Sequence, residues 1–163
     1  MKVGIIVYSY TGNTLLVAQV LAQKLEEKGI NYALLRIETD QNKEMDAKKV
    51  VLKSCFDLRP FDCFVFASPI HGFTLAAPFK KFLREQFHES KKPVLGFVSQ
   101  FLPFNCCGPN RAKAFLTNYL QKQNTPFTFM GAVKWCKKNR QEQIELLVEG
   151  IVQELVNESG DSN

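Results

Sequence analysis

The chain has 163 residues, of which 45% are hydrophobic and 23% charged, and it carries a formal net charge of +5. This length suits one domain with a sizeable core, so we expect a single domain over residues 1–163 with a frayed tail over residues 158–163. No apolar run approaches the roughly 20 residues of a membrane-spanning helix, which excludes an integral membrane protein. The apolar run at residues 3–8 is interrupted where a signal peptide would continue, and we therefore predict a cytoplasmic protein with no membrane partner.

Apolar strand-like runs alternate with amphipathic helical runs along the whole chain. Strands are predicted over residues 2–8, 31–37, 61–67, 94–100 and about 127–133. Each of these runs is almost continuously apolar, which is typical of strands that are buried on both faces of a parallel sheet.

Helices are predicted between these strands and after the last one, over residues 13–28, 42–55, 78–87 and 112–120 and from Asn139 to Val156. Gly29 is a natural residue to end the first helix, and Asn139-x-x-Glu142 is typical of a capping box before the last. Segment 42–55 is polar, so we expect a poorly packed helix there. Five strand–helix units predict an α/β fold with a doubly wound sheet in a three-layer α/β/α sandwich.

The five cysteines form no C-x-x-C pair and leave one over, which argues against a disulfide framework or a zinc site. They are Cys55, Cys63, Cys106, Cys107 and Cys136. Cys63 falls in a strand pattern and is expected to be buried as a small apolar residue. Cys106 and Cys107 are adjacent, and we expect free thiols there rather than a strained disulfide between neighbours.

Positive charge is concentrated in one segment of the chain. No carboxylate lies between Glu89 and Glu142, whereas nine cations do: Lys91, Lys92, Arg111, Lys113, Lys122, Lys134, Lys137, Lys138 and Arg140. Such asymmetry is typical of an electropositive face, although a basic face that only meets solvent is an equal alternative. No nucleic-acid-binding module is recognisable, so we predict no nucleic-acid partner.

Ligands of doubly wound folds bind at the carboxyl ends of the strands, where the loops 9–14, 68–77 and 100–110 are expected to meet. The first of these loops is Ser9-Tyr10-Thr11-Gly12-Asn13-Thr14, between a buried strand and a helix start. A helix N-terminus offers free N–H groups and the positive end of the helix dipole, and the hydroxyls add further hydrogen bonds. Gly12 lets the backbone approach a ligand closely. The loop therefore predicts an anion site that uses no Lys or Arg.

Several other chemistries are excluded by their motifs. The chain has no P-loop, no G-x-G-x-x-G after the first strand and no G-x-S-x-G elbow. The first and third strands end in Ser9 and Ser68 rather than in the carboxylates that a Mg²⁺-binding receiver domain needs. A cysteine phosphatase loop fails on spacing, because Arg111 is one residue too close to Cys106 and two too close to Cys107.

The other two loops are rich in rings and small residues. They read Ser68-Pro69-Ile70-His71-Gly72-Phe73-Thr74 and Phe101-Leu102-Pro103-Phe104-Asn105. Together they are suited to sandwich a flat aromatic ligand whose phosphate sits in the first loop. The alternative, that Phe101 and Phe104 only anchor their loop, stays open.

The first loop matches the phosphate loop of the flavodoxin family, [ST]-x-T-G-x-T, at every defined position. Ser68-Pro69 followed by Gly72 resembles the second flavin loop of that family, and Gly108-x-Asn110 resembles its glycine-containing turn. The resemblance spans essentially the whole chain. It implies a flavodoxin-like five-stranded parallel sheet of order 2-1-3-4-5 and non-covalent binding of FMN.

The resemblance also implies which residues bind each part of FMN. The phosphate would be held by Ser9, Tyr10, Thr11, Gly12, Asn13 and Thr14. The flavin ring would be flanked by Ser68, Pro69, Ile70, His71, Gly72, Phe73, Ser99, Gln100, Phe101, Phe104 and Gly108. Among these, Gly72 is best placed to turn its peptide toward the reduced flavin. Neither a catalytic side chain nor a metal is expected, because the flavin carries the redox chemistry.

The basic segment departs from the family, whose electron-shuttling members are typically acidic around the flavin. Two functions follow from the resemblance. One is an electron carrier that exchanges electrons with a redox protein, and the other is an NAD(P)H-dependent reductase of quinones or similar small acceptors. The basic residues over 90–141 would then dock an acidic partner or the extra phosphate of NADPH, the latter around Arg111 and Lys113. A flavodoxin fold without flavin is a third alternative.

Overall fold

The computed structural model describes residues 1–88 and 91–160. Its elements are, in chain order, β1 (Lys2–Val7), α1 (Asn13–Glu27), β2 (Asn31–Arg36), β3 (Cys63–His71), β4 (Thr74–Leu75), α2 (Ala77–Gln86), β5 (Val94–Gln100), the 3₁₀ turn η1 (Asn105–Cys107), α3 (Pro109–Gln121), β6 (Phe127–Lys134) and α4 (Arg140–Gly160).

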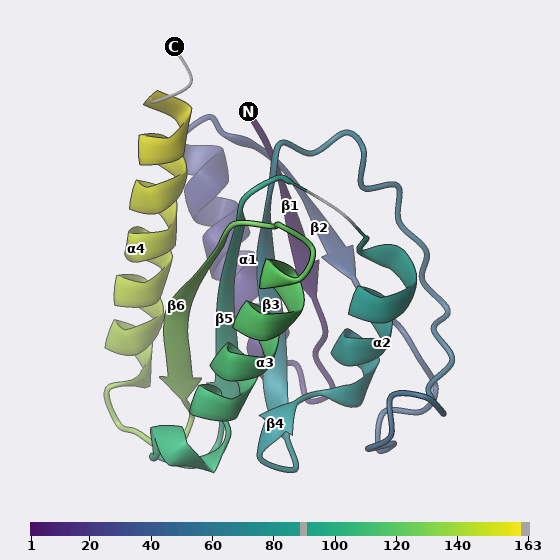
Figure 1. Ribbon diagram of the computed structural model, residues 1–163. Helices are drawn as coiled ribbons and strands as arrows, with labels where there is room; N and C mark the ends of the chain where they lie inside the picture. Colours follow the sequence, from purple (N-terminus) through teal and green to yellow (C-terminus); the bar gives the residue numbers. More distant parts are fainter. Residues whose placement is uncertain (89–90, 161–163) are drawn as a thin grey trace.

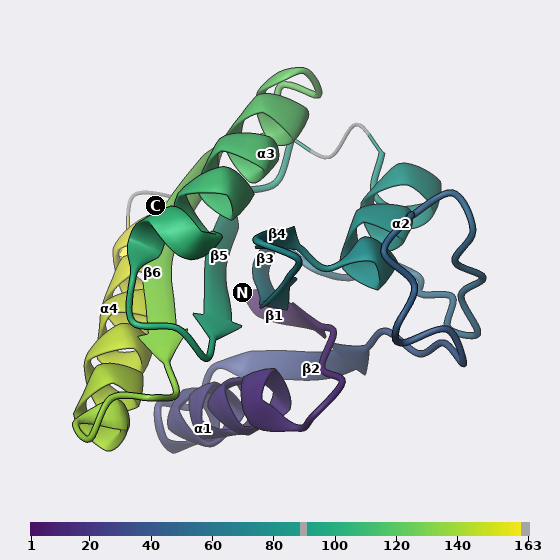
Figure 2. The same ribbon diagram turned by 90° about the horizontal axis from the view of Figure 1, so that it is seen from below.

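The main sheet has the order β2-β1-β3-β5-β6, and every neighbouring pair in it is parallel. Counted without the short β4, this is the predicted order 2-1-3-4-5, so the predicted fold class is confirmed. Helices α1 and α4 cover one face of the sheet and α2 and α3 cover the other (Figures 1 and 2). None of the helices in the described residues combines the length and apolarity that a membrane crossing needs.

Most predicted boundaries lie within two or three residues of the observed ones. Strand β5 has the predicted bounds, whereas β3 begins later than predicted and continues to His71 because its last residues pair with β4 in an antiparallel hairpin. Residues 158–160 of the expected frayed tail continue helix α4, and residues 161–163 lie outside the described part of the chain.

The predicted helix over residues 42–55 is wrong, because the chain from β2 to β3 runs as an irregular segment. Its polar side chains bind backbone groups that a helix would need for itself. The Glu44 carboxylate accepts hydrogen bonds from the N–H groups of Met45 and Asp46, at 2.9 and 2.8 Å, and the Gln41 amide oxygen accepts one from Val51 N at 2.6 Å. These local hydrogen bonds stabilise turns in place of a helix.

The core lies in two layers, one on each side of the sheet. Alternation along β1 sends Ile5 to the layer under α1 and α4, and Ile6 to the layer under α2 and α3. The second layer is unusually aromatic. Phe66 lies at its centre, with ring centroids 5.4 Å from Phe79 and 5.0 Å from Phe87 in edge-to-face contact. Cys63 is buried in the first layer, as predicted.

The aromatic layer provides a test of the packing. Phe66 is almost fully buried, so Phe66→Ala should lower the free energy of unfolding by about 3–5 kcal/mol. Phe101→Ala makes the same chemical change at a ring that is 72% exposed, and it should change stability by less than about 0.5 kcal/mol. Urea unfolding of both variants measures the difference. Equal losses would contradict the packing described for Phe66.

Candidate functional site

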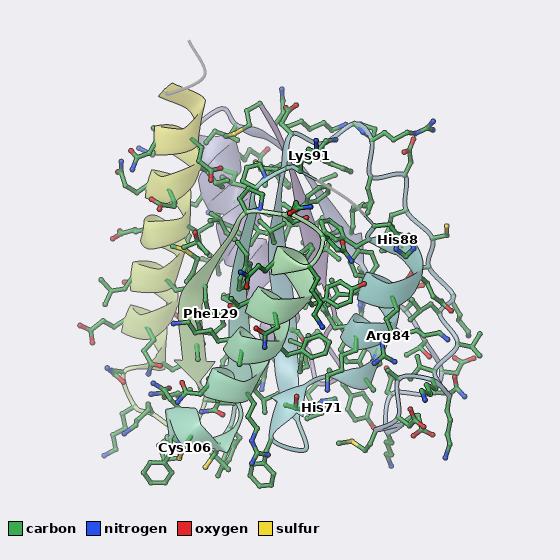
Figure 3. The ribbon with its side chains drawn as sticks, in the orientation of Figure 1. His71, Arg84, His88, Lys91, Cys106 and Phe129 are labelled. Atoms are coloured by element: carbon green, nitrogen blue, oxygen red, sulfur yellow. The ribbon has the colours of Figure 1, made fainter. Side chains whose placement is uncertain are left out.

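The carboxyl ends of β1, β3 and β5 meet at one end of the sheet, which Figure 2 shows from below. There the chain leaves β1 through residues 8–12, leaves β3 through the β4 hairpin, and leaves β5 through residues 101–108. His71 and Cys106, from two of these loops, both lie at this end in Figure 3. The predicted convergence of the three loops is therefore confirmed by the sheet topology.

The first loop presents backbone donors at the start of helix α1. The first helical hydrogen bond runs from Leu16 N to Gly12 O at 2.9 Å, so the amides before Leu16 are left over, and no side chain caps the helix. Gly12 has φ +91°, which favours glycine, and a Cβ added there would meet no atom within 4 Å. The space above the loop is open to a ligand.

Two hydroxyls of this loop have different surroundings. Ser9 Oγ is buried and has no hydrogen-bond partner in the described residues. Thr14 Oγ1 lies 2.7 Å from Ser99 Oγ, so it joins the helix start to the end of β5. Whichever of this pair donates, the other keeps its own proton, which it can donate to an anion.

The second loop is a two-residue hairpin. His71 pairs with Thr74, and the two turn residues Gly72 and Phe73 have φ values of +55° and +62°. Both angles are those of a type I′ turn, in which a phenylalanine is unusual. A Cβ at Gly72 would meet the end of the Met45 side chain, from the irregular segment, so a larger residue there would need Met45 to move as well as a left-handed backbone.

The His71 ring stands edge-on to two tyrosines. Its centroid lies 6.0 Å from that of Tyr8 and 6.3 Å from that of Tyr10. Burial lowers the pKa of His71, which keeps the imidazole neutral at pH 7. Burial also raises the pKa of Tyr8 to about 12, and its hydroxyl donates to Asn42 Oδ1 at 3.1 Å.

The third loop is fixed at its start by Gln100, whose Nε2 donates to Phe104 O at 2.9 Å. The Gln100 Oε1 atom is buried and has no partner in the described residues. Phe101 and Phe104 are 72% and 62% exposed, so neither ring anchors the loop in the core. Gly108, with φ +135°, packs so closely on Ile70 that a side chain would not fit, which joins the third loop to the second.

The irregular segment after β2 adds a wall that the sequence did not reveal. A pocket of about 330 Å³ beside the first loop is lined by Ser9 and Tyr10 and, from β2 onward, by Arg36, Ile37, Glu38, Thr39, Asp40, Asn42 and Lys53. The contact of Met45 with Gly72 places the same segment against the hairpin. The sequence signal for this loop was its density of Asp, Asn and Glu, which bind local backbone groups.

The basic residues divide between the two ends of the sheet. Lys92 precedes β5 and Lys122 follows α3, so both lie at the amino ends of the strands, and Lys92 Nζ donates to Arg59 O at 2.9 Å. Those at the site end are Arg111, Lys113, Lys134, Lys137, Lys138 and Arg140, from the start of α3 and the connection between β6 and α4.

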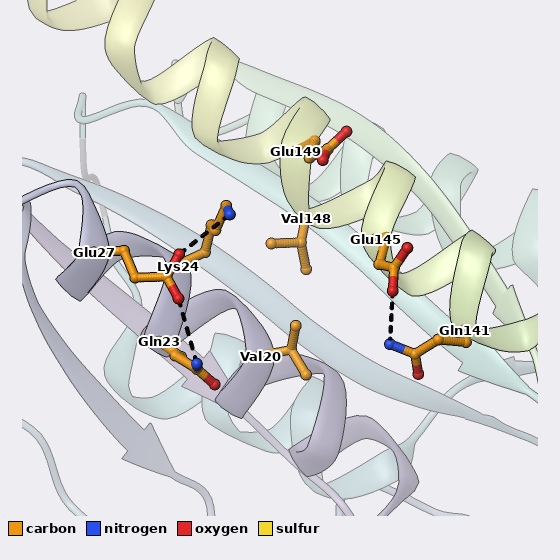
Figure 4. Close-up of a pocket in the computed structure, with 8 residues that line it drawn as sticks. All are labelled: Val20, Gln23, Lys24, Glu27, Gln141, Glu145, Val148 and Glu149. Carbon is orange, nitrogen blue, oxygen red and sulfur yellow. Dashed lines mark hydrogen bonds and ion pairs between the residues drawn. The ribbon is translucent and has the colours of Figure 1, made fainter.

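A second groove lies away from this end, between α1 and α4 (Figure 4). It measures about 190 Å³, and Val20 and Val148 form its floor. Its polar groups already bind one another, as in the Lys24–Glu27 ion pair at 3.1 Å and the hydrogen bond from Gln141 to Glu145 at 3.0 Å. Only residues of α1 and α4 line it, and no strand-end loop reaches it.

The strand-end site fits the chemical groups of FMN. The free amides before Leu16 and the partnerless Ser9 hydroxyl suit a phosphate. The partnerless oxygen of Gln100 suits an N–H of a flavin ring, and exposed rings border the opening. Within the described residues, no group of three or more His, Cys, Asp or Glu side chains is arranged to hold a metal ion.

Solved structures similar to this one are flavodoxins and other flavoproteins. Flavodoxin 1 from Bacillus cereus is 18% identical with a TM-score of 0.63, over 91% of this chain and 93% of that chain. A flavodoxin from Streptococcus pneumonia TIGR4 is 15% identical with a TM-score of 0.64, over 94% and 99%. A flavoprotein from Lactobacillus acidophilus, solved in complex with FMN, is 15% identical with a TM-score of 0.58, over 80% and 91%. At such identities these matches show a shared fold.

No curated protein matches the chain. The family model described as NADPH-dependent FMN reductase matches residues 1–98, which is more than half of the chain and contains the first two loops of the site. The protein therefore belongs to the NADPH-dependent FMN reductase family and takes FMN as its cofactor.

Proposed function

We propose that this protein is an electron carrier, in which the three strand-end loops hold FMN and leave its ring accessible to a redox partner. The observation that carries the proposal is the cluster of exposed apolar side chains around the site. Of the eleven large hydrophobic residues that are exposed in the described part of the chain, six lie on these loops or against them: Tyr10, Met45, Phe73, Phe101, Leu102 and Phe104. A concentration of exposed apolar surface is typical of a place where another molecule binds.

The phosphate of FMN would lie in the first loop. Backbone N–H groups from Tyr10 to Thr14 would donate to it, as would the hydroxyls of Ser9 and Thr11. The pair formed by Thr14 and Ser99 would supply one further donor. This arrangement uses no cation, and the open space over Gly12 leaves room for the phosphate.

The flavin ring would lie between the second and third loops. Residues 68–73 would flank one side, with the Gly72 peptide able to turn toward the ring, and residues 99–104 with Gly108 would flank the other. Gln100 Oε1 would accept a hydrogen bond from the ring. His71 is neutral and braced by two tyrosines, so it adds a polar edge to the site without adding charge.

FMN supplies transfer of one or two electrons when bound, and the protein supplies position and surroundings. The residues named above would bind the phosphate and orient the ring. Six cations of residues 91–141 lie at the site end of the sheet, and this segment of the chain contains no Asp or Glu. They favour an acidic redox protein as the partner.

A second function is favoured by the family match itself. An NAD(P)H-dependent reductase would use the same FMN site and take hydride from a nicotinamide. Arg111 and Lys113, in the first turns of α3 beside the third loop, are suited to hold the extra phosphate of NADPH. The two functions differ in whether the protein needs another protein to become reduced.

The Ser9 hydroxyl gives the sharpest test of the FMN site. Ser9→Ala removes a buried hydroxyl without a partner, so it should raise the unfolding free energy of the FMN-free protein by about 1 kcal/mol. It should also weaken FMN binding about tenfold, because a phosphate oxygen loses a donor. Urea unfolding and fluorescence titration with FMN measure the two effects.

Thr117→Val, at an exposed position of α3, serves as the control and should change neither quantity. Loss of stability in FMN-free Ser9→Ala would mean that Ser9 already has a partner in the fold. Unchanged FMN affinity would remove Ser9 from the site.

Turnover distinguishes the two functions. FMN-loaded protein, mixed with NADPH and a quinone, should show no sustained oxidation of NADPH if it is a carrier. Addition of a flavodoxin reductase should then start the reaction. Sustained turnover by the protein alone would overturn the carrier proposal in favour of the reductase, and in that case Arg111→Gln should raise the KM for NADPH more than that for NADH.

A further inference from the structure

Two adjacent thiols lie on the third loop, in the short turn η1. Cys106 Sγ and Cys107 Sγ are 3.8 Å apart and within hydrogen-bonding contact. Both thiols are free, Cys106 is exposed and Cys107 is half-buried. In Figure 3, Cys106 lies at the end of the molecule where the strand-end loops gather. Neither thiol has a role in holding FMN as proposed above.

The pair lies at the start of a helix and is followed by two cations in the sequence. The two cysteines directly precede Gly108 and the 13-residue helix α3, whose N-terminus is the positive end of its dipole. Arg111 and Lys113 follow in the first turns of that helix. The hydrogen bond with Cys106 raises the pKa of Cys107. Cys106 is the more exposed of the two thiols, so a small disulfide reaches its sulfur first.

We propose that Cys106 and Cys107 form a thiol redox site that reacts with small-molecule disulfides of the glutathione type and closes to a disulfide between the two residues. The Cys106 thiolate attacks one sulfur of the small disulfide, which forms a mixed disulfide and releases one thiolate. Cys107 then gives up its proton and attacks Cys106 Sγ, which releases the second thiolate. Two cysteine thiols are oxidised, one small disulfide is reduced to two thiols, and the two cysteine protons pass to the products.

A disulfide between neighbouring cysteines closes a strained ring, so it is readily reduced back to two thiols. Neighbouring Cα atoms are about 3.8 Å apart, below the roughly 4.4–6.8 Å of ordinary disulfides. Strained, exposed disulfides are easily reduced and serve as labile rather than structural bonds. The dithiol is thus the resting form, and the disulfide forms when the small disulfide is in excess over its thiol.

Closure acts on the loop that borders the flavin site, a consequence that rests on the proposed function. Phe104 O accepts hydrogen bonds from Gln100 Nε2 at 2.9 Å and from Cys107 N at 3.2 Å. Closing the ring twists the peptide between the cysteines out of the 3₁₀ turn, which breaks the bond from Cys107 N. Gly108, the next residue, packs on Ile70 of the second loop. Oxidation should therefore loosen both walls of the flavin site.

The test treats the FMN-free full chain with excess glutathione disulfide, blocks remaining thiols by alkylation and maps the peptides by mass. The wild type should lose both thiols together as a Cys106–Cys107 bond. Cys107→Ser should hold one glutathione on Cys106, and Cys106→Ser should react at position 107 at least tenfold more slowly. Cys55→Ser and Cys136→Ser, which change the two other exposed thiols, should close like the wild type.

A stable mixed disulfide on wild-type Cys106 would overturn the proposal, as would a bond between Cys106 and Cys136, whose N–H bonds to Phe101 O. FMN titration then tests the consequence for the flavin site. Affinity should fall about tenfold in the oxidised wild type and stay unchanged in a Cys106→Ser/Cys107→Ser variant. Equal affinities would overturn the coupling, whereas a failure to bind FMN in either form would count against the proposed function and leave the mapped disulfide standing.

Discussion

The parallel register of β1, β3 and β5 is the constraint on which the site depends. Val7 pairs with Ala67, and Pro69 pairs with Ser99, so the three strands deliver their next residues to one edge of the sheet. Burial on both faces leaves these strands no freedom to slide, because a shift by one residue would send every side chain to the opposite layer. The Thr14–Ser99 hydroxyl pair, 85 residues apart in sequence, is possible only because that register is fixed. The core thereby sets the geometry of a site to which it contributes few atoms.

The fold and the first loop were predictable because their signals are local. A strand buried on both faces is apolar throughout, which is why β5 has the predicted bounds. The first loop follows from a strand, a glycine and hydroxyl residues before a helix, all within a few positions. The hairpin at Gly72 and Phe73 was missed because type I′ turns usually carry Asn-Gly or Asp-Gly, and this pair gives no such signal. Its conformation depends on tertiary contacts, among them that of Met45.

The conformation of the segment between β2 and β3 could not be predicted from the spacing of its apolar residues. Ala47 and Val50 are three positions apart and are both buried, as on a helix, yet they pack against Ala77 from an irregular backbone. The irregular backbone is favoured by hydrogen bonds that sequence periodicity does not reveal. The side chains of Glu44 and Gln41 accept them from nearby backbone N–H groups, and the Thr39 hydroxyl donates one to a backbone carbonyl. Because this segment forms a wall of the site, the part that was hardest to predict also helps to determine what the site admits.

The hairpin of β3 and β4 has a consequence for how a ligand reaches its place. Only two residue pairs join these strands, Ile70 with Leu75 and His71 with Thr74, and the turn holds Phe73 in a left-handed conformation that costs about 1–2 kcal/mol. A ladder this short and this strained is expected to open by itself while the five-stranded sheet stays intact. One side of the site is therefore rigid, because the first loop is tied to the core, and the other side can open locally where the flavin ring would enter. Loading and release of a bulky cofactor would then require local opening of a few residues and no unfolding of the domain.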